Sequence, residues 1–104
     1  MLKKHELAKL SKLVDTQDFR VAQLFKVLSD PNRCKIFRLV LKSKGELCVS
    51  DFAQILKISP AAASQHLKLL ELTGVLIKER KGQRVCFRAQ TSDSLVTAVT
   101  RAIA

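Results

Sequence analysis

Apolar residues recur with helical spacing over most of the chain, and the pattern changes to strict alternation near its end. The helical spacing predicts N-terminal helices, a central helix, a pair of short helices and a C-terminal helix, over residues 1–29, 31–44, 49–74 and 92–104. The alternating pattern predicts a β-hairpin over residues 75–89. The chain is therefore expected to form a single domain that is mainly α with a small β-hairpin (α+β).

The clearest pattern lies where the two short helices meet. Ser59 is placed to cap the second helix, Pro60 occupies its first position, and Gly74 follows its end. The buried stripe of this helix is expected to contain Ala63, Leu67 and Leu70, at the spacing i, i+4, i+7. Two helices joined by so tight a turn predict a helix-turn-helix.

The opposite face of the second helix carries small or hydrogen-bonding side chains near its N-terminus. These residues are Ala61, Ala62, Ser64, Gln65 and Lys68. Small side chains let a helix approach the floor of a DNA major groove, while Ser and Gln hydrogen-bond to base edges. A surface helix that is rich in alanine because alanine favours helix would give the same pattern. From this helix alone, both interpretations stay open.

The boundaries between the earlier helices are also marked in the sequence. Residues 15–18 are expected to form a break or kink, and Asp30 is placed to cap a central helix that Pro31 opens. The central helix is apolar over more than one face, so we expect it to be mostly buried.

Apolar stripes at both ends of the chain suggest more apolar surface than one small domain can cover. The N-terminal stripes contain Leu7, Leu10, Leu13, Val14, Val21, Leu24, Phe25 and Leu28. The C-terminal stripe contains Leu95, Val96, Val99 and Ile103. We therefore expect a dimer through the N- and C-terminal helices.

The charge of the chain indicates a polyanionic partner. Nineteen Lys and Arg residues against nine Asp and Glu give a net charge of +10, which favours nucleic acid before membrane. The tip of the hairpin carries four of these cations, Lys78, Arg80, Lys81 and Arg84. They form either a solvated surface or a wing along a phosphate backbone. The sequence lacks an apolar stretch that could cross a bilayer or serve as a signal peptide, so a cytoplasmic location is expected.

Three segments, in this order, resemble the ArsR family of bacterial winged-helix repressors. They are LSDPNR at 28–33, GELCVSDF at 45–52 and SPAAASQHLKLL at 59–70. The resemblance implies a homodimer that binds double-stranded DNA at an inverted-repeat operator and represses transcription until an effector releases it. It also implies base-reading positions at Ser59, Ala61, Ala62, Ser64 and Gln65. For His66, a structural hydrogen bond is expected rather than a base contact.

The chain departs from this family at its best-known sensing sites. Many members bind metal ions through a Cys-Val-Cys segment, where this chain has Cys48, Val49 and Ser50. A site for a soft ion needs two or three converging thiolates. A second family site needs Asp and His on the last helix, which here has Asp93 but no His. We therefore expect no metal site, no cofactor, and an effector other than a classical metal ion.

The three cysteines leave a second kind of sensor open. Cys86 is predicted to share a strand face with Arg84 and Arg88, whose charges would favour the thiolate. Cys48 and Cys86 are thus candidate residues of a redox or electrophile sensor of the same fold, while Cys34 is expected to be small buried filler.

Other function classes have less support in the sequence. Neither His is placed with a Cys, Ser or acidic partner in a nucleophile arrangement, and the chain has no glycine-rich phosphate loop, so we do not expect an enzyme. A non-specific basic nucleic-acid-binding or architectural protein remains an alternative. Stacking on single strands is disfavoured because the only aromatic residues are five Phe. A protein-interaction module is the third alternative.

Overall fold

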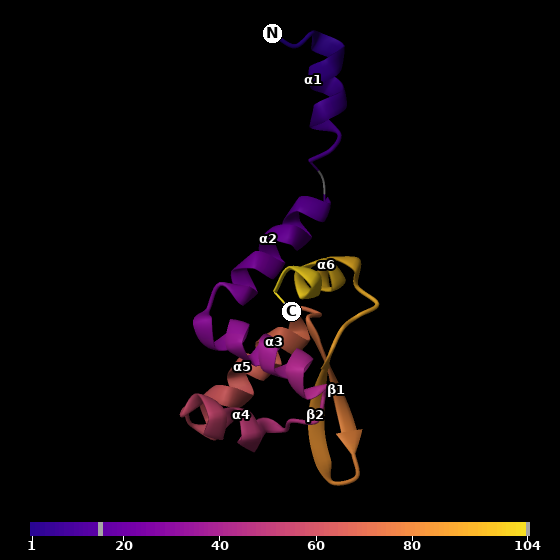
Figure 1. Ribbon diagram of the computed structural model, residues 1–104. Helices are drawn as coiled ribbons and strands as arrows, with labels where there is room; N and C mark the ends of the chain where they lie inside the picture. Colours follow the sequence, from indigo (N-terminus) through magenta and orange to yellow (C-terminus); the bar gives the residue numbers. More distant parts are fainter. Residues whose placement is uncertain (15, 104) are drawn as a thin grey trace.

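The computed structural model describes residues 1–14 and 16–103 of the chain. Within them it contains six helices and one two-stranded antiparallel sheet (Figure 1). The elements in order are α1 (Lys4–Ser11), α2 (Thr16–Leu28), α3 (Pro31–Ser43), α4 (Val49–Leu56), α5 (Pro60–Leu72), β1 (Leu76–Lys81), β2 (Arg84–Ala89) and α6 (Ser94–Ile103). The expected class, mainly α with one hairpin, is confirmed.

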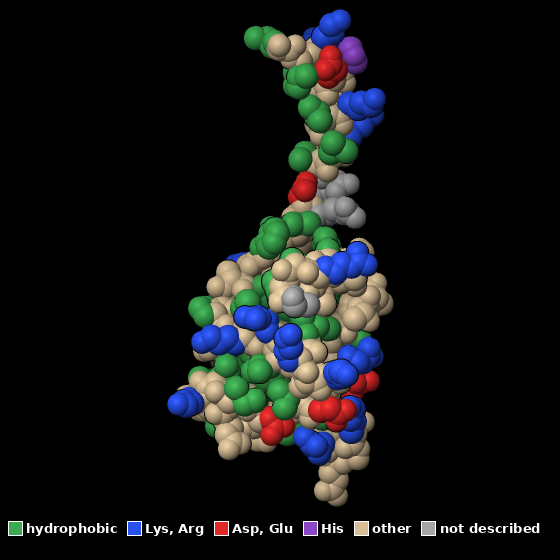
Figure 2. Space-filling view, in the orientation of Figure 1, with side chains coloured by type: hydrophobic (Ala, Val, Ile, Leu, Met, Phe, Trp, Pro, Cys, Tyr) green, Lys and Arg blue, Asp and Glu red, His purple; other side chains and the backbone are tan. Residues whose placement is uncertain are grey.

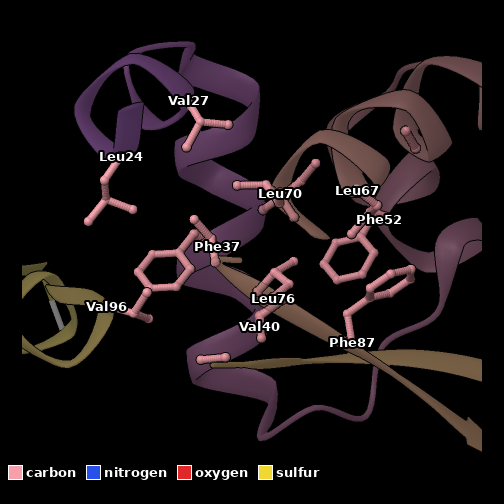
Figure 3. Close-up of a cluster of buried hydrophobic side chains, with 14 of the residues drawn as sticks. Leu24, Val27, Phe37, Val40, Phe52, Leu67, Leu70, Leu76, Phe87 and Val96 are labelled. Carbon is pink, nitrogen blue, oxygen red and sulfur yellow. The ribbon is translucent and has the colours of Figure 1, made fainter. Parts of the chain in front are cut away.

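The core lies where α3 meets the other elements of the main body (Figure 3). Its fully buried large side chains include Ile36, Phe37, Phe52, Leu67, Leu70, Val75, Leu76 and Val96. Figure 3 shows Val96 of α6 beside Phe37 of α3, and Phe52 of α4 beside Phe87 of β2. Only Ile36, Phe37 and Val40 of α3 are buried, and its other residues are half-buried or exposed, so the expectation of a mostly buried central helix is only partly met.

The predicted caps form as expected. The Asp30 carboxylate accepts the Arg33 N–H at 3.0 Å, and the Ser59 hydroxyl accepts the Ala62 N–H at 3.0 Å. Each cap is followed by a proline at the first helical position. Gly74, after α5, has a φ of +75°, a conformation that favours glycine. These local signals determine where α3 and α5 begin and where α5 ends.

The N-terminal region differs from the prediction. Asp15 lies outside the described residues, but residues 16–18 are already helical, so the predicted break does not extend over them. The helix predicted within residues 1–14 is limited to α1, which buries none of its residues. In α2, Val27 is buried beside Leu24 while Phe25 is 65% exposed, because the buried pair faces α3.

The apolar spacing of α4 predicts a buried face that contains Val49, Phe52, Ile55 and Leu56, and this prediction is partly wrong. Ile55 is 50% exposed, and Ala53 is buried together with Phe52 instead. The packing of α4 against α5 turns the Phe52–Ala53 side inward, and Ile55 faces a groove beside α3.

Arg20 joins three elements that are distant in sequence. Its guanidinium donates to Asp93 Oδ2 at 2.7 Å and also to the carbonyl of Thr73, at the end of α5. Asp93 in turn caps α6 by accepting the Leu95 N–H at 2.8 Å. The hydrogen bond from Arg20 is the main reason that the pKa of Asp93 lies below its ordinary value. Thus α2, the end of α5 and the start of α6 are held together by one side chain.

Two neighbouring leucines on α5 test which face is buried. Leu67 is 1% exposed and Leu69 is 43% exposed. Leu67→Ala should lower the free energy of unfolding by about 2–5 kcal/mol because it leaves a cavity in the core. Leu69→Ala should cost less than about 1 kcal/mol. Urea denaturation followed by circular dichroism measures both, and equal losses would contradict the assigned face.

Replacing Asp93 should make the free energy of unfolding less dependent on pH in the acid range. The pKa of Asp93 is lower when folded than its unfolded value of about 3.9, so its charge stabilises the fold above that pH, and this stabilisation is lost as pH falls through the folded pKa. Asn caps helices as well as Asp. Asp93→Asn should therefore be less stable than the wild type at pH 7, with the gap closing below about pH 4. Thermal melts across pH measure this, with the exposed Asp18→Asn as the control.

Candidate nucleic-acid interface

The outward face of α5 contains the residues that the sequence predicts there. Ala63, Leu67 and Leu70 are buried, which turns the neighbouring positions of the helix outward. The exposed residues of the predicted set are Ser59, Ala61, Ser64, Gln65 and Lys68, and Ala62 is half-buried. The small side chains of this surface leave the helix backbone accessible. Beside them lie hydroxyl, amide and ammonium groups that have no role in the core.

His66 lies at the edge of this surface and contacts α3. Its Nδ1 is 3.4 Å from Nη1 of Arg33, which also donates from Nε to the Val27 carbonyl at 2.7 Å. A guanidinium has only donors, so Nδ1 must accept and the proton of a neutral ring lies on Nε2. The expected structural hydrogen bond of His66 is confirmed.

The hairpin stands beside α5 and turns Lys78 toward that helix. β1 and β2 pair from Leu76 opposite Ala89 to Lys81 opposite Arg84, with Gly82 in the turn at a φ of +66°. A hollow of about 380 Å³ separates the hairpin from α5, and Ser64, Lys68 and Lys78 are among its lining residues. Arg80 lies two residues beyond Lys78, on the same face of β1.

Three of the four predicted wing cations form ion pairs with acids from earlier elements. The pairs are Lys78 with Glu71 at 3.8 Å, Lys81 with Glu46 at 3.2 Å, and Arg84 with Asp51 at 3.5 Å. Figure 2 shows acidic and basic side chains side by side over this lower part of the molecule. Arg80 is exposed and has no ion pair within the described ranges. Exposed pairs of this kind are weak, so a phosphate can compete for the paired cations.

The three cysteines differ in burial and in their contacts. Cys86 is 1% exposed, and Arg84 on its strand donates instead to Cys48 Sγ, at 3.8 Å. The pKa of the half-buried Cys48 thiol is lowered mainly by a hydrogen bond with Ser50 at 3.3 Å, with a smaller contribution from Arg84, and Asp51 opposes the shift. Cys34, expected to be small buried filler, is half-buried.

Within residues 1–14 and 16–103, no three side chains of His, Cys, Asp or Glu converge as a set of metal ligands. None of the helices formed by these residues combines the length and apolarity needed to span a membrane.

Comparison with known proteins identifies the family. Residues 30–78 match the family model described as "Bacterial regulatory protein, arsR family". The chain is 35% identical over 69 residues to the transcriptional repressor SdpR of Bacillus subtilis, a match that covers 66% of this chain and 74% of that protein. The chain belongs to the ArsR family. The resemblance seen in its sequence motifs is therefore confirmed.

Two other ArsR-type comparisons extend this result. The chain is 46% identical over 67 residues to a cadmium resistance transcriptional regulatory protein CadC homolog of Staphylococcus aureus, covering 64% of this chain but only 54% of that relative. The chain therefore spans about half the length of this relative. The homodimeric winged helix-turn-helix DNA-binding domain Mb0332 of Mycobacterium bovis superposes with a TM-score of 0.65 at 24% identity, covering 98% of this chain and 87% of that chain. This match shows that the fold is a winged helix-turn-helix.

Proposed function

We propose that this ArsR-family chain is a homodimeric, cytoplasmic repressor that binds an inverted-repeat operator in double-stranded DNA. The observation that carries the proposal is the outward face of α5, where small and hydrogen-bonding side chains are exposed directly opposite a buried stripe. That face lies beside a cationic hairpin, as recognition of a groove and its phosphates requires.

In this proposal, the first two turns of α5 enter the major groove. Ala61 and Ala62 add little bulk, so the helix backbone can lie close to the base edges. Ser64 and Gln65 read those edges by hydrogen bonds, and Gln suits the bidentate pattern of adenine. Lys68, one turn further along and beside the hollow, reaches a phosphate at the groove wall.

The hairpin contacts the backbone next to the groove. Arg80 is the wing cation that is ready to bind phosphate, because it has no ion pair in the described part of the chain. Lys78, Lys81 and Arg84 must exchange a weak pair with a carboxylate for one with a phosphate. We therefore expect Arg80 to contribute most to backbone binding, which the sequence could not distinguish among the four.

A second copy of the chain is proposed to cover the apolar surface of the N-terminal helices. Figure 2 shows apolar side chains exposed along α1 and at the adjoining end of α2. The large ones in these helices and the turn after α1 are Leu7, Leu10, Leu13, Val14, Phe19 and Phe25. An isologous pair formed through them places two α5 helices about a twofold axis, which matches an inverted repeat.

We propose that release from DNA does not depend on a classical metal site. The names of several relatives refer to cadmium or arsenic resistance. In this chain, however, the corresponding segment offers the thiol of Cys48 and the hydroxyl of Ser50, which is a poor donor for soft ions. The effector is therefore expected to be of another chemical class.

Two substitutions should separate base reading from backbone binding. Gln65→Ala should reduce the preference for operator over random DNA by about 1–3 kcal/mol, because it removes a base contact. Arg80→Gln should weaken both kinds of binding equally and reduce the salt dependence, d log K/d log[salt], by about one unit. Fluorescence anisotropy with the two duplexes at several salt concentrations measures both effects.

The matched control is Arg101→Gln, on α6, which lies at the opposite end of the main body from the hairpin tip (Figure 1). It should leave discrimination unchanged. If Gln65→Ala lowers operator and random-DNA binding equally, α5 is not the reading element. If the wild type never prefers its own promoter, the architectural alternative is favoured.

The dimer surface can be tested at Phe19, which is 77% exposed on α2. Phe19→Glu should weaken dimerisation on the order of 100-fold, because burying a carboxylate in place of an aromatic anchor is costly. Sedimentation equilibrium measures the dissociation constant. Ile55→Glu, at an exposed apolar residue of α4, serves as the control and should leave the dimer intact. A wild type that is monomeric at micromolar concentration would exclude this assembly.

A further inference from the structure

Cys48 and Cys86 lie directly opposite each other across an isolated antiparallel β-bridge. This bridge joins the residue just before α4 to the middle of β2, on the edge of β2 that does not pair with β1. Side chains of directly opposed residues in antiparallel strands project to the same side. The bridge therefore brings together two thiols that are 38 positions apart in the chain.

The backbone geometry of the bridge suits a disulfide. The Cys48 N–H donates to the Asp51 carboxylate at 2.9 Å, and its carbonyl accepts the N–H groups of Asp51 and Phe52 at 3.0 and 3.2 Å. With these groups engaged inside α4, the pair has the character of a non-hydrogen-bonded one, in which the Cα atoms lie about 4.5 Å apart. That spacing falls within the range of disulfides, about 4.4–6.8 Å.

The surroundings give the two thiols different roles. Cys48 Sγ is half-buried and lies 3.3 Å from Ser50 Oγ and 3.8 Å from Arg84 Nη2, contacts that lower its pKa and favour the nucleophilic thiolate. Cys86 is almost fully buried, and its thiol makes a long contact to the Glu46 carbonyl at 3.9 Å. Cys48 is thus the residue that an oxidant reaches first, and Cys86 is sheltered beside it.

We propose that Cys48 and Cys86 form a dithiol that a hydroperoxide oxidises to an intramolecular disulfide. Cys48 loses its proton, and its thiolate attacks the terminal oxygen of the hydroperoxide, so that an S–O bond forms and the O–O bond breaks. The alkoxide that leaves takes up the proton lost by Cys48 and becomes an alcohol (water, from hydrogen peroxide). Cys86 then gives up its proton and attacks Cys48 Sγ. The S–S bond forms, and the displaced hydroxide leaves with that proton as water. Two thiols lose two electrons, and the hydroperoxide gains them.

The disulfide would connect the first helix of the helix-turn-helix to the wing. Cys48 is the N-cap residue of α4, and its thiol donates to Asp51 at 3.1 Å, the carboxylate that also pairs with Arg84. Oxidation removes that donor and fixes α4 to β2, so it changes the anchoring of a wing cation. We expect a change of several-fold in operator affinity. This consequence rests on the proposed function, whereas formation of the disulfide does not.

The test uses the full chain, treated with hydrogen peroxide without DNA, denatured, and labelled with N-ethylmaleimide. The intact mass of the oxidised protein should be lower by two hydrogen atoms and should include one N-ethylmaleimide label. The reduced protein should carry three labels. Cys34→Ser should still lose two hydrogens and carry no label. Cys48→Ser and Cys86→Ser should each fail to form the bond. Cys86→Ala, checked by circular dichroism, guards against misfolding of the buried Ser variant.

Several results would overturn the proposal. These are three labels after treatment, a bond that involves Cys34, covalently linked pairs of chains on a non-reducing gel, or a Cys48 that stops at the sulfenic acid. Duplex binding of the reduced and oxidised forms is measured separately. If the reduced protein fails to bind its promoter, the proposed function is wrong, while the mass result still decides on the disulfide. If the disulfide forms but affinity is unchanged, the proposed link to DNA binding is wrong.

Discussion

Burial of one stripe of α5 is the interaction on which the rest of the structure depends. Ala63, Leu67 and Leu70 enter the core beside Phe37 and Leu76, and each has almost no exposed surface. A helix turns by about 100° per residue, so fixing this stripe also fixes which residues face solvent. The exposure of small and hydrogen-bonding side chains on the outward face of α5 is therefore a consequence of core packing. The same packing energy that folds the domain presents Gln65 and its neighbours outward.

The second constraint is the extended segment between α3 and α4, which lies along β2. Glu46 pairs with Lys81, Asp51 pairs with Arg84, and Cys48 faces Cys86 across the bridge. One acid of this segment, Glu46, and one in the first turn of α4, Asp51, hold two cations of the hairpin, so the wing is tied to the start of α4. Its direction relative to α5 is thereby restricted, although each exposed pair contributes little energy by itself.

The sequence predicts those features that depend on neighbours in the chain. The Asp30 and Ser59 caps, the prolines after them and the α5 stripe all act within one or two helical turns, so their signals lie in a few consecutive residues. The ion pairs of the wing join residues that are 7 to 35 positions apart, and no local pattern marks Arg80 as the free cation. The exposure of Ile55 and the burial of Cys86 also depend on distant segments and have no local signal. Alternation shows which side of a strand a residue occupies, but not whether another segment covers that side.

Asp51 connects the DNA-binding surface with the thiol pair. One carboxylate oxygen, Oδ2, accepts the Cys48 N–H at 2.9 Å and the Cys48 thiol at 3.1 Å, and lies 3.5 Å from Arg84 Nη2. The pKa of Asp51 is lowered mainly by the hydrogen bond from the Cys48 backbone N–H and next by the one from the Cys48 thiol. The Asp51 carboxyl group is therefore charged at neutral pH. Because these three groups share one acceptor atom, a change in one of them alters the strength of the interactions that the others make with it. Loss of the thiol proton at Cys48 therefore acts on the start of α4 and on a wing cation at the same point. This shared oxygen is the physical route by which chemistry at a sulfur could reach the surface that α5 and the hairpin present.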